Sequence, residues 1–359
     1  MKIQSITLAD ISIPLHKPFI TALRRVEAMS SVLVRIETNE GYIGYGEAPP
    51  TAAITGETMG SIRAAIEERI GPSIIGLDLD AFDDIMSALR HSIVKNTSAK
   101  AAVDMALYDL LAQSCGKPLY KLLGGARGRL ETDITISLND TETMVRDSMS
   151  AAREGYNILK VKVGKSGIAD TNTIAAIREA CPGAVLRVDA NQGWDVKQAI
   201  RVIRAMEDKN LDIELVEQPV PAYDVDGLRR VTRAVSTPIL ADEAVFSTRD
   251  AIHIITTGSA DYINIKLMKT GGIYEALKIC AVAEEYGIQC MMGCMLESKV
   301  AVSAAAHMAC GKGIITRADL DGPSLCINDP CTGGPIFSGP HIQMPDEPGI
   351  GITQVPAFG

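Results

Sequence analysis

Apolar and polar residues follow two different patterns along the chain, and the pattern changes near residue 125. Residues 6–13 follow the alternation of a strand, and residues 31–48 predict two more strands around a polar turn. Residues 59–71 and 98–113 repeat their apolar positions with the period of a helix. Together these patterns predict an α+β unit at the start of the chain.

From residue 131 onward, short β-branched runs alternate with amphipathic segments of ten or more residues, as in parallel β-α-β units. The polar residues that end these runs are spaced 24 to 28 residues apart. That period over eight units predicts a (β/α) barrel. Charged residues also end strands simply because loops are solvated, but a constant period favours the barrel. The predicted strand ends are Thr135, Lys162, Asp189, Glu217, Asp242, Lys266, Cys294 and Asp319.

The predicted fold class is therefore α/β, a modified TIM (β/α) barrel with an α+β capping domain at its N-terminus. We assign residues 1–125 to the capping domain and residues 126–324 to the catalytic barrel. Residues 325–359 are rich in Gly and Pro and lack helical periodicity. We expect this tail to return to the capping domain and complete it.

Composition narrows the class of partner. The 359 residues include 35 Lys and Arg and 44 Asp and Glu, a formal net charge of −9 without a basic run, which argues against nucleic acid and anionic membranes. No apolar stretch approaches the roughly 18 residues of a membrane span. The eight cysteines form no C-x-x-C pair, so we interpret them as reduced thiols of a cytoplasmic protein. The remaining partner is a small molecule or a protein.

Three consecutive predicted strand ends carry the carboxylates Asp189, Glu217 and Asp242. Carboxylates that converge at the mouth of a barrel repel one another unless a cation neutralises them. An all-oxygen set from three strands suits Mg²⁺ and leaves coordination positions for substrate and water. The alternative is a network of salt bridges with the neighbouring lysines.

Lysines flank the carboxylates in strand order: Lys160 and Lys162 precede them, and Lys266 and Lys269 follow. Lys162 and Lys266 fall on the second and sixth strands, on opposite sides of the barrel, which suits two bases that address opposite faces of one carbon. We expect Mg²⁺ and a neighbouring ammonium to lower the pKa of these lysines. The chemistry indicated is abstraction of a proton α to a carboxylate, with the enolate stabilised by Mg²⁺ and by Lys160. A structural ion pair is the alternative role for each lysine.

The motifs resemble those of the enolase superfamily, and specifically of its muconate-lactonising subgroup, over essentially the whole chain. In that family the second lysine of K-x-K and the first of K-x-x-K-x-G-G are the two bases, which correspond to Lys162 and Lys266. The matching motifs are Lys160-Val161-Lys162, Asp189-Ala190-Asn191, Glu217-Gln218-Pro219, Asp242-Glu243 and the segment 266–272.

Within the subgroup, the chain is most similar to the dipeptide epimerases, whose D-x-D after the eighth strand is present as Asp319 and Asp321. The resemblance implies that these carboxylates hold the ammonium of a dipeptide. It also implies that Arg24 or Arg25, in a loop of the capping domain, pairs with a glutamate side chain of the substrate. Thr135 and Cys294 are further expected substrate contacts.

The resemblance implies one Mg²⁺ per subunit, a homo-oligomer and a role in the metabolism of peptidoglycan peptides. L-Ala-L-Glu is the leading substrate hypothesis, and hydrophobic or cationic dipeptides are alternatives. Other reactions on this scaffold are N-acylamino acid racemisation, o-succinylbenzoate synthesis and muconate cycloisomerisation, against which the two aspartates argue. A Schiff-base aldolase would not need three carboxylates, and a silent binding protein would not need both bases.

Overall fold

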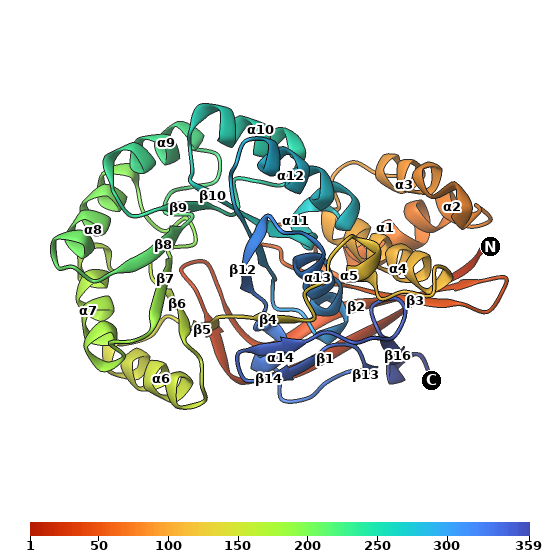
Figure 1. Ribbon diagram of the computed structural model, residues 1–359, viewed down its shortest axis with the longest axis horizontal. Coiled ribbons are helices and arrows are strands. Elements are labelled where there is room, and N and C mark those ends of the chain that lie inside the picture. Colours follow the sequence, from red (N-terminus) through yellow and green to blue (C-terminus); the bar gives the residue numbers. More distant parts are fainter.

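The computed structural model describes residues 1–359. Its N-terminal part is an antiparallel sheet of three strands covered by helices (Figure 1). The longest helix, α4, is apolar nearly all round and is buried against β3, where Gly46 leaves room for the backbone of Ala102. The elements are β1 (Ile3–Ile20), β2 (Arg25–Thr38), β3 (Ile43–Ala48), α1 (Met59–Ala65), η1 (Ile66–Ile70), α2 (Gly71–Ile74), η2 (Leu79–Ala81), α3 (Phe82–His91), α4 (Thr97–Ser114) and α5 (Leu119–Leu122).

The second part is a parallel sheet of eight strands in sequential order, with helices on its outer face (Figure 1). The predicted α/β barrel with an N-terminal α+β unit is therefore confirmed. Its strands are β5 (Ile134–Ile136), β6 (Ile158–Lys162), β7 (Val185–Asp189), β8 (Ile213–Glu217), β9 (Ile239–Ala241), β10 (Tyr262–Lys266), β11 (Cys290–Gly293) and β12 (Ile315–Asp319). Its helices are α6 (Thr141–Arg153), η3 (Gly167–Ala169), α7 (Asp170–Ala180), α8 (Val196–Asp208), α9 (Val225–Ala234), α10 (Thr248–Thr257), α11 (Leu267–Thr270), α12 (Ile273–Glu285), α13 (Lys299–Gly311) and α14 (Gly322–Leu325).

The carboxyl ends of the strands lie in register, which brings the polar strand ends to one rim. Lys162 pairs with Asp189 across β6 and β7, and Asp189 pairs with Glu217 across β7 and β8. On the other side, Gly293 of β11 pairs with Lys266 and with Asp319. The predicted strand ends therefore fall at the last residue of a strand or within one residue of it.

The C-terminal tail contacts both parts of the molecule. Its strands are β13 (Thr332–Gly333), β14 (Ile336–Ser338), β15 (His341–Gln343) and β16 (Ile352–Gln354), followed by η4 (Pro356–Phe358). β15 pairs with β4 (Arg129–Glu131), which directly precedes the first barrel strand, β5. On the capping side, the Ile350 N–H donates to Asp109 of α4 at 2.9 Å. The division at residues 125 and 325 stays a prediction.

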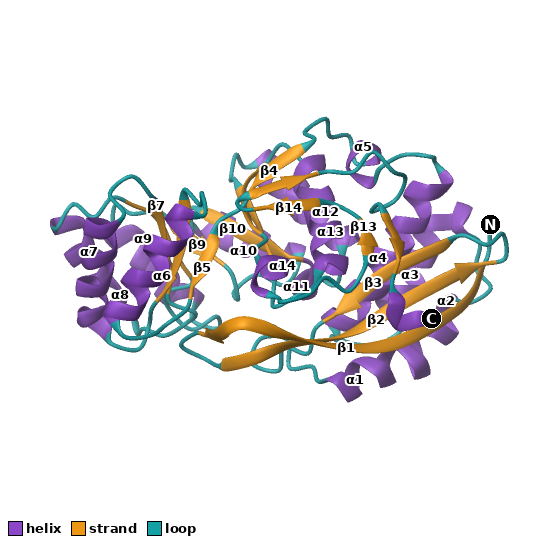
Figure 2. Cartoon of the chain, turned by 90° about the horizontal axis from the view of Figure 1, so that it is seen from below, coloured by secondary structure: helices purple, strands orange, loops and turns teal.

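The long β1–β2 hairpin carries part of the capping domain to the rim of the barrel (Figures 1 and 2). Its tip is a tight turn in which the Thr21 N–H donates to the Arg24 carbonyl at 2.9 Å. The tip docks on the segment after β5, since the Leu138 N–H donates to the Ile20 carbonyl at 2.9 Å and the Ile20 N–H to Ser137 Oγ at 3.2 Å. None of the helices combines the length and apolar character that a membrane crossing demands.

Candidate active site

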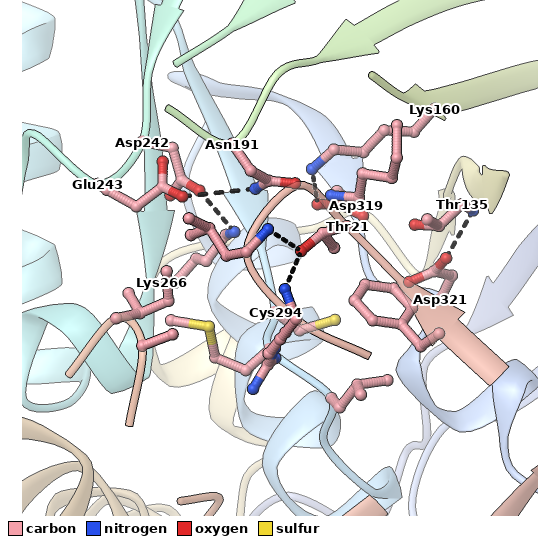
Figure 3. Close-up of a pocket in the computed structure, with 18 of the residues that line it drawn as sticks. Thr21, Thr135, Lys160, Asn191, Asp242, Glu243, Lys266, Cys294, Asp319 and Asp321 are labelled. Atoms are coloured by element: carbon pink, nitrogen blue, oxygen red, sulfur yellow. Dashed lines mark hydrogen bonds and ion pairs between the residues drawn. The ribbon is translucent and has the colours of Figure 1, made fainter. Parts of the chain in front are cut away.

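A cavity lies where the hairpin tip and the loop after β3 meet the carboxyl ends of the barrel strands. It comprises about 590 Å³ of space between protein atoms, its opening to solvent included. The hairpin contributes Phe19, Thr21 and Arg24, and the loop contributes Ala53 and Ile54. Figure 3 shows most of its polar wall, which consists of Thr135, Lys160, Lys162, Asn191, Asp242, Glu243, Lys266, Cys294, Asp319 and Asp321.

Lysine ammonium groups lie between the three strand-end carboxylates. Lys160 Nζ is 3.2 Å from Asp189 Oδ2 and 2.8 Å from Glu217 Oε2. Lys162 Nζ is 2.6 Å from Asp189 Oδ2, and Lys266 Nζ is 2.8 Å from Asp242 Oδ2. All six side chains are buried. Asp189 and Glu217 do not line the cavity themselves, but they contact lysines that do.

Two local devices orient the carboxylates. Asp189 Oδ1 accepts the Asn191 N–H at 2.8 Å, an Asx turn in which Asn191 has a φ of 42°. Gln218 Oε1 accepts the N–H groups of Asp242 at 2.9 Å and Ala244 at 3.1 Å. Gln218 therefore couples the end of β8 to the backbone that follows β9.

Burial and charge act in opposite directions on this cluster. Burial alone would raise the pKa of Asp242, but the ammonium groups of Lys266 and Lys269 outweigh it and hold that pKa well below its ordinary value. Burial, together with the negative charge of Asp189, raises the pKa of Glu217 to about 7. Adjacent carboxylates in the same cluster thus differ widely in proton affinity, because the lysines distribute unevenly among them.

The lowering of the lysine pKa that is expected from Mg²⁺ and a neighbouring ammonium stays a prediction. Among the protein groups, burial lowers the pKa of Lys266, but the contact with Asp242 outweighs burial and raises the pKa above the ordinary value. Burial lowers the pKa of Lys269. The carboxylates that are expected to act as metal ligands are direct partners of the lysines.

The chemistry of the donor set fits a hard divalent cation. Asp189, Glu217 and Asp242 offer only oxygen, and they stand at or directly after the ends of three neighbouring strands. Glu217 Oε2 and Asp242 Oδ1 are buried, and each forms an ion pair with an ammonium group, Lys160 Nζ at 2.8 Å and Lys269 Nζ at 2.7 Å. No three His, Cys, Asp or Glu side chains surround one point as they stand, since ammonium groups lie between the carboxylates. The same residues would hold Mg²⁺ if the ammonium groups withdrew from them.

Lys162 and Lys266 reach the cavity from the second and sixth barrel strands, β6 and β10, with the carboxylates of β7 to β9 between them. Lys162 Nζ also lies 5.8 Å from the centre of the Phe19 ring, so the hairpin covers it. Alternation along β6 places Lys160 on the same face as Lys162, and both are buried as expected. The arrangement brings two ammonium groups to one small cavity from different sides.

The aspartates after β12 form the opposite wall. Asp319 Oδ2 accepts a bond from Lys160 Nζ at 2.7 Å, and Asp321 Oδ2 accepts the Thr135 N–H at 2.7 Å (Figure 3). Burial raises the pKa of Asp321 to about 6, and the charge of Asp319 adds to the effect. For Asp319, burial is outweighed by Lys160, so its pKa falls to about 2. The pair is suited to receive a cation from the cavity.

The two arginines of the hairpin turn differ in direction. Arg24 lines the cavity, and burial lowers its pKa. Arg25 is exposed and pairs with Glu27 at 3.0 Å on the surface. Of the two candidates, only Arg24 faces the site. Cys294 also lines the cavity, next to Met295 of the same segment.

Two of the polar residues that the barrel contributes to the cavity, Glu243 and Asn191, were not among the predicted site residues. Glu243 is buried, and burial together with the charge of Asp242 raises its pKa to about 8. Asn191 Nδ2 donates to Glu243 Oε1 at 3.4 Å. Both follow a strand-end carboxylate by one or two positions and belong to the quoted motifs, and that proximity was the available signal.

Comparison with known proteins extends these observations. Residues 3–124 match the mandelate racemase / muconate lactonizing enzyme N-terminal domain, and residues 143–357 match the enolase C-terminal domain-like family. The L-Ala-D/L-Glu epimerase of Clostridium acetobutylicum is 52% identical over 356 residues, 99% of either chain.

Two solved structures are also similar. A substrate-liganded complex of the L-Ala-D/L-Glu epimerase from Bacillus subtilis has a TM-score of 0.98 and 50% identity, with 99% of both chains covered. The dipeptide epimerase of Enterococcus faecalis complexed with Mg and L-Leu-L-Tyr has a TM-score of 0.95 and 42% identity, covering 99% of this chain and 100% of that one. Related structures therefore contain magnesium and a dipeptide.

Proposed function

This chain belongs to the mandelate racemase / muconate lactonizing enzyme family of the enolase superfamily, and we propose that it is a magnesium-dependent dipeptide epimerase, an isomerase. The observation that carries the proposal is the pair Lys162 and Lys266, which line one cavity from β6 and β10. The same cavity contains Asp319 and Asp321, which are carboxylates for a substrate ammonium.

The reaction is a 1,1-proton transfer at the α-carbon of the second residue of the dipeptide. One lysine, as the neutral amine, removes the proton, and the other, as the ammonium, returns a proton to the opposite face. Asp189, Glu217 and Asp242 would hold Mg²⁺, which would supply Lewis-acid stabilisation of the negative charge that develops on the substrate carboxylate. The ammonium of Lys160, with its three carboxylate neighbours, contributes further positive charge on the same side.

Substrate selection rests on charges at the two ends of the cavity. Asp319 and Asp321 bind the ammonium of the first residue, and Thr135 and Cys294 contact the substrate beside them. Arg24 pairs with an acidic side chain on the second residue, because a half-buried guanidinium that lines the cavity is suited to an anionic partner. L-Ala-L-Glu, converted to L-Ala-D-Glu, is therefore the proposed substrate.

Dipeptides with other side chains are the second candidate. Leu23, Ile54 and Leu296 also line the cavity, so one part of it offers apolar surface. The Enterococcus relative was solved with L-Leu-L-Tyr. Substrates without an ammonium, as in the other reactions of the superfamily, leave Asp319 and Asp321 without a partner, which disfavours them.

The test is a library of L,L-dipeptides incubated with the protein in D₂O, with mass detection of solvent deuterium at the α-carbon. We expect Mg²⁺-dependent exchange, fastest for L-Ala-L-Glu, and loss of exchange in excess EDTA without loss of the folded barrel. Undiminished turnover in EDTA would contradict the metal site. If L-Ala-L-Leu exchanged fastest, the proposed specificity for an acidic side chain would be wrong, but the assignment as a dipeptide epimerase would stand.

Two controls separate other classes of function. Borohydride with a carbonyl substrate traps a Schiff-base aldolase and leaves an epimerase unmodified. A silent binding protein exchanges no α-proton of any dipeptide.

We further propose one Mg²⁺ per subunit, a homo-oligomeric assembly, a cytoplasmic location and a role in the metabolism of peptidoglycan peptides. Sedimentation with metal analysis of the dialysed protein tests the first two.

A further inference from the structure

The barrel does not close through a backbone ladder. β5 and β12 are the two ends of the eight-stranded order, and all strands that neighbour each other within that order are hydrogen-bonded. Between the two end strands, the Asp133 N–H donates to the Ala318 carbonyl at 3.4 Å, which is long for such a bond. We call residues 132–135 and 318–321 the seam.

Side chains supply the bonds that a ladder would otherwise make. The Leu320 N–H donates to Thr132 Oγ1 at 2.7 Å, and the Thr135 N–H donates to Asp321 Oδ2 at 2.7 Å. The seam therefore includes a carboxylate of the candidate ammonium site. Any movement of β12 relative to β5 moves Asp321 directly.

Arg187 crosses the seam from inside the barrel. It lies on β7, two residues before Asp189, and is 3% exposed. Its Nη1 donates to Asp133 Oδ2 at 2.8 Å and to the Ala318 carbonyl at 3.0 Å, so one guanidinium nitrogen binds both sides. Its Nε donates to Glu214 Oε2 at 2.6 Å, which anchors the guanidinium from a third element.

Arg187 and Asp133 form a buried ion pair. Asp133 is fully buried, and its Oδ1 accepts no hydrogen bond, so Arg187 is its ion-pair partner. A planar guanidinium with several fixed donors can bind a carboxylate, a carbonyl and a second carboxylate at once, which a lysine ammonium does in a less directed way. Such a network specifies geometry more than it adds stability.

We propose that Arg187 and Asp133 clamp the seam and thereby position Asp319 and Asp321 for the substrate ammonium. The Ala318 carbonyl that Arg187 holds directly precedes Asp319, and the Asp133 backbone bonded to that carbonyl leads into Thr135, the donor to Asp321. Arg187 is a positioning residue, since it acts through the aspartates and does not line the cavity. The expected effect on KM rests on the proposed function, because it assumes a dipeptide substrate. The contacts that form the clamp do not depend on the substrate.

The first experiment measures the clamp without any substrate. Hydrogen exchange with mass detection is compared for wild type, Arg187→Met and the matched control Arg317→Met. Arg317 shares Glu214 with Arg187, through a bond of 2.9 Å, but makes no bond across the seam. We expect peptides covering the seam to exchange at least tenfold faster in Arg187→Met and at the wild-type rate in Arg317→Met. Equal seam exchange in the two variants overturns the proposal.

The second experiment separates positioning of the ammonium site from general damage. With L-Ala-L-Glu, Arg187→Met should raise KM at least tenfold and change kcat less than threefold, because Arg187 bonds neither Lys162 nor Lys266, the two proposed bases. The Ki of N-acetyl-L-glutamate, which has carboxylates but no ammonium, should change less than twofold. Arg187→Lys should show a smaller increase in KM than Arg187→Met. If KM and Ki rise together, or if KM does not rise, the positioning role is wrong.

A second variant tests the proposal if Arg187→Met does not fold. Arg187→Met leaves Asp133 buried without its partner, which is destabilising. The double variant Arg187→Met/Asp133→Asn removes both charges of that pair. We expect its hydrogen exchange in the seam and its KM to equal those of Arg187→Met. If the wild-type protein epimerises no dipeptide, the proposed function fails, and the exchange measurement still decides whether the clamp exists.

Discussion

Glu47 joins the capping domain to the barrel through a buried carboxylate. It lies on β3, and its Oε1 accepts the Ser298 N–H at 2.8 Å, while its Oε2 accepts Ser298 Oγ at 2.6 Å and the Ala301 N–H at 3.0 Å. These donors belong to the first turn of α13, whose N–H groups lack partners within the helix. The segment that precedes α13 contributes Met295 and Leu296 to the cavity. Glu47 therefore connects the two domains and also stabilises the segment that forms one wall of the cavity.

Glu47→Gln keeps the size of this side chain, removes its charge and replaces one accepting oxygen by an amide –NH2, which only donates. A hydrogen bond to a charged group contributes about 1.5 to 3 kcal/mol and a neutral one about 0.5 to 1.5. The bonds that become neutral lose about 2 kcal/mol together, and the backbone N–H that faces the –NH2 loses its bond, about 2 kcal/mol more. Loss of a negative charge at a helix N-terminus costs about 0.3 to 1 kcal/mol more. The neutral amide is easier to bury, which offsets part of the loss. We expect the free energy of unfolding to fall by about 2 to 4 kcal/mol.

Urea unfolding followed by circular dichroism measures this loss as a lower midpoint. The matched control is Glu67→Gln, which removes an exposed carboxylate paired with Arg63 at 3.2 Å in the same domain, and a surface pair contributes about 0 to 1 kcal/mol. KM should rise in Glu47→Gln because the wall formed by Met295 and Leu296 loosens. If the two variants unfold at the same urea concentration, the trans-domain contact does not stabilise the protein as argued.

Three further predictions concern catalysis, specificity and acid stability. Lys162→Ala and Lys266→Ala should each abolish epimerisation. Each variant should still exchange the α-proton of one epimer with D₂O, and the two variants should act on opposite epimers, as measured by NMR. Normal epimerisation by either variant would refute the two-base mechanism. Arg24→Met should lower kcat/KM for L-Ala-L-Glu at least tenfold more than for L-Ala-L-Leu, since only the former loses a carboxylate partner; an equal loss would show that Arg24 does not select the side chain. Burial lowers the pKa of His307 to about 3, so an unfolded chain with a histidine pKa near 6.5 takes up the proton first, and stability is lost as the pH falls from about 6.5 toward 3. His307→Gln should remove about 2 kcal/mol of the stability loss between pH 6.5 and 5 in urea titrations, and an unchanged pH dependence would contradict this.

The repeating pattern of the sequence determines the barrel and the residues at its rim. Strand alternation and the constant spacing of β/α units are local properties, so they place Lys162, Asp189 and Glu217 at strand ends before any distant contact is known. Register then brings these residues together without further information. The same reasoning separates Lys162 from Lys266 by four strands. This part of the site follows from the chain because one geometric rule repeats along it.

Only the tertiary structure decides which side chains bind across the domains and the seam. The tight turn of the hairpin sends Arg24 into the cavity and Arg25 to the surface, although the two are adjacent and identical in type. Arg187 and Asp133 occupy equivalent positions two β/α repeats apart, and Glu47 and Ser298 are 251 positions apart. The repeat does not predict that either pair is in contact, since contact depends on how whole elements pack. A buried charge reveals its purpose only through the partner that packing brings to it.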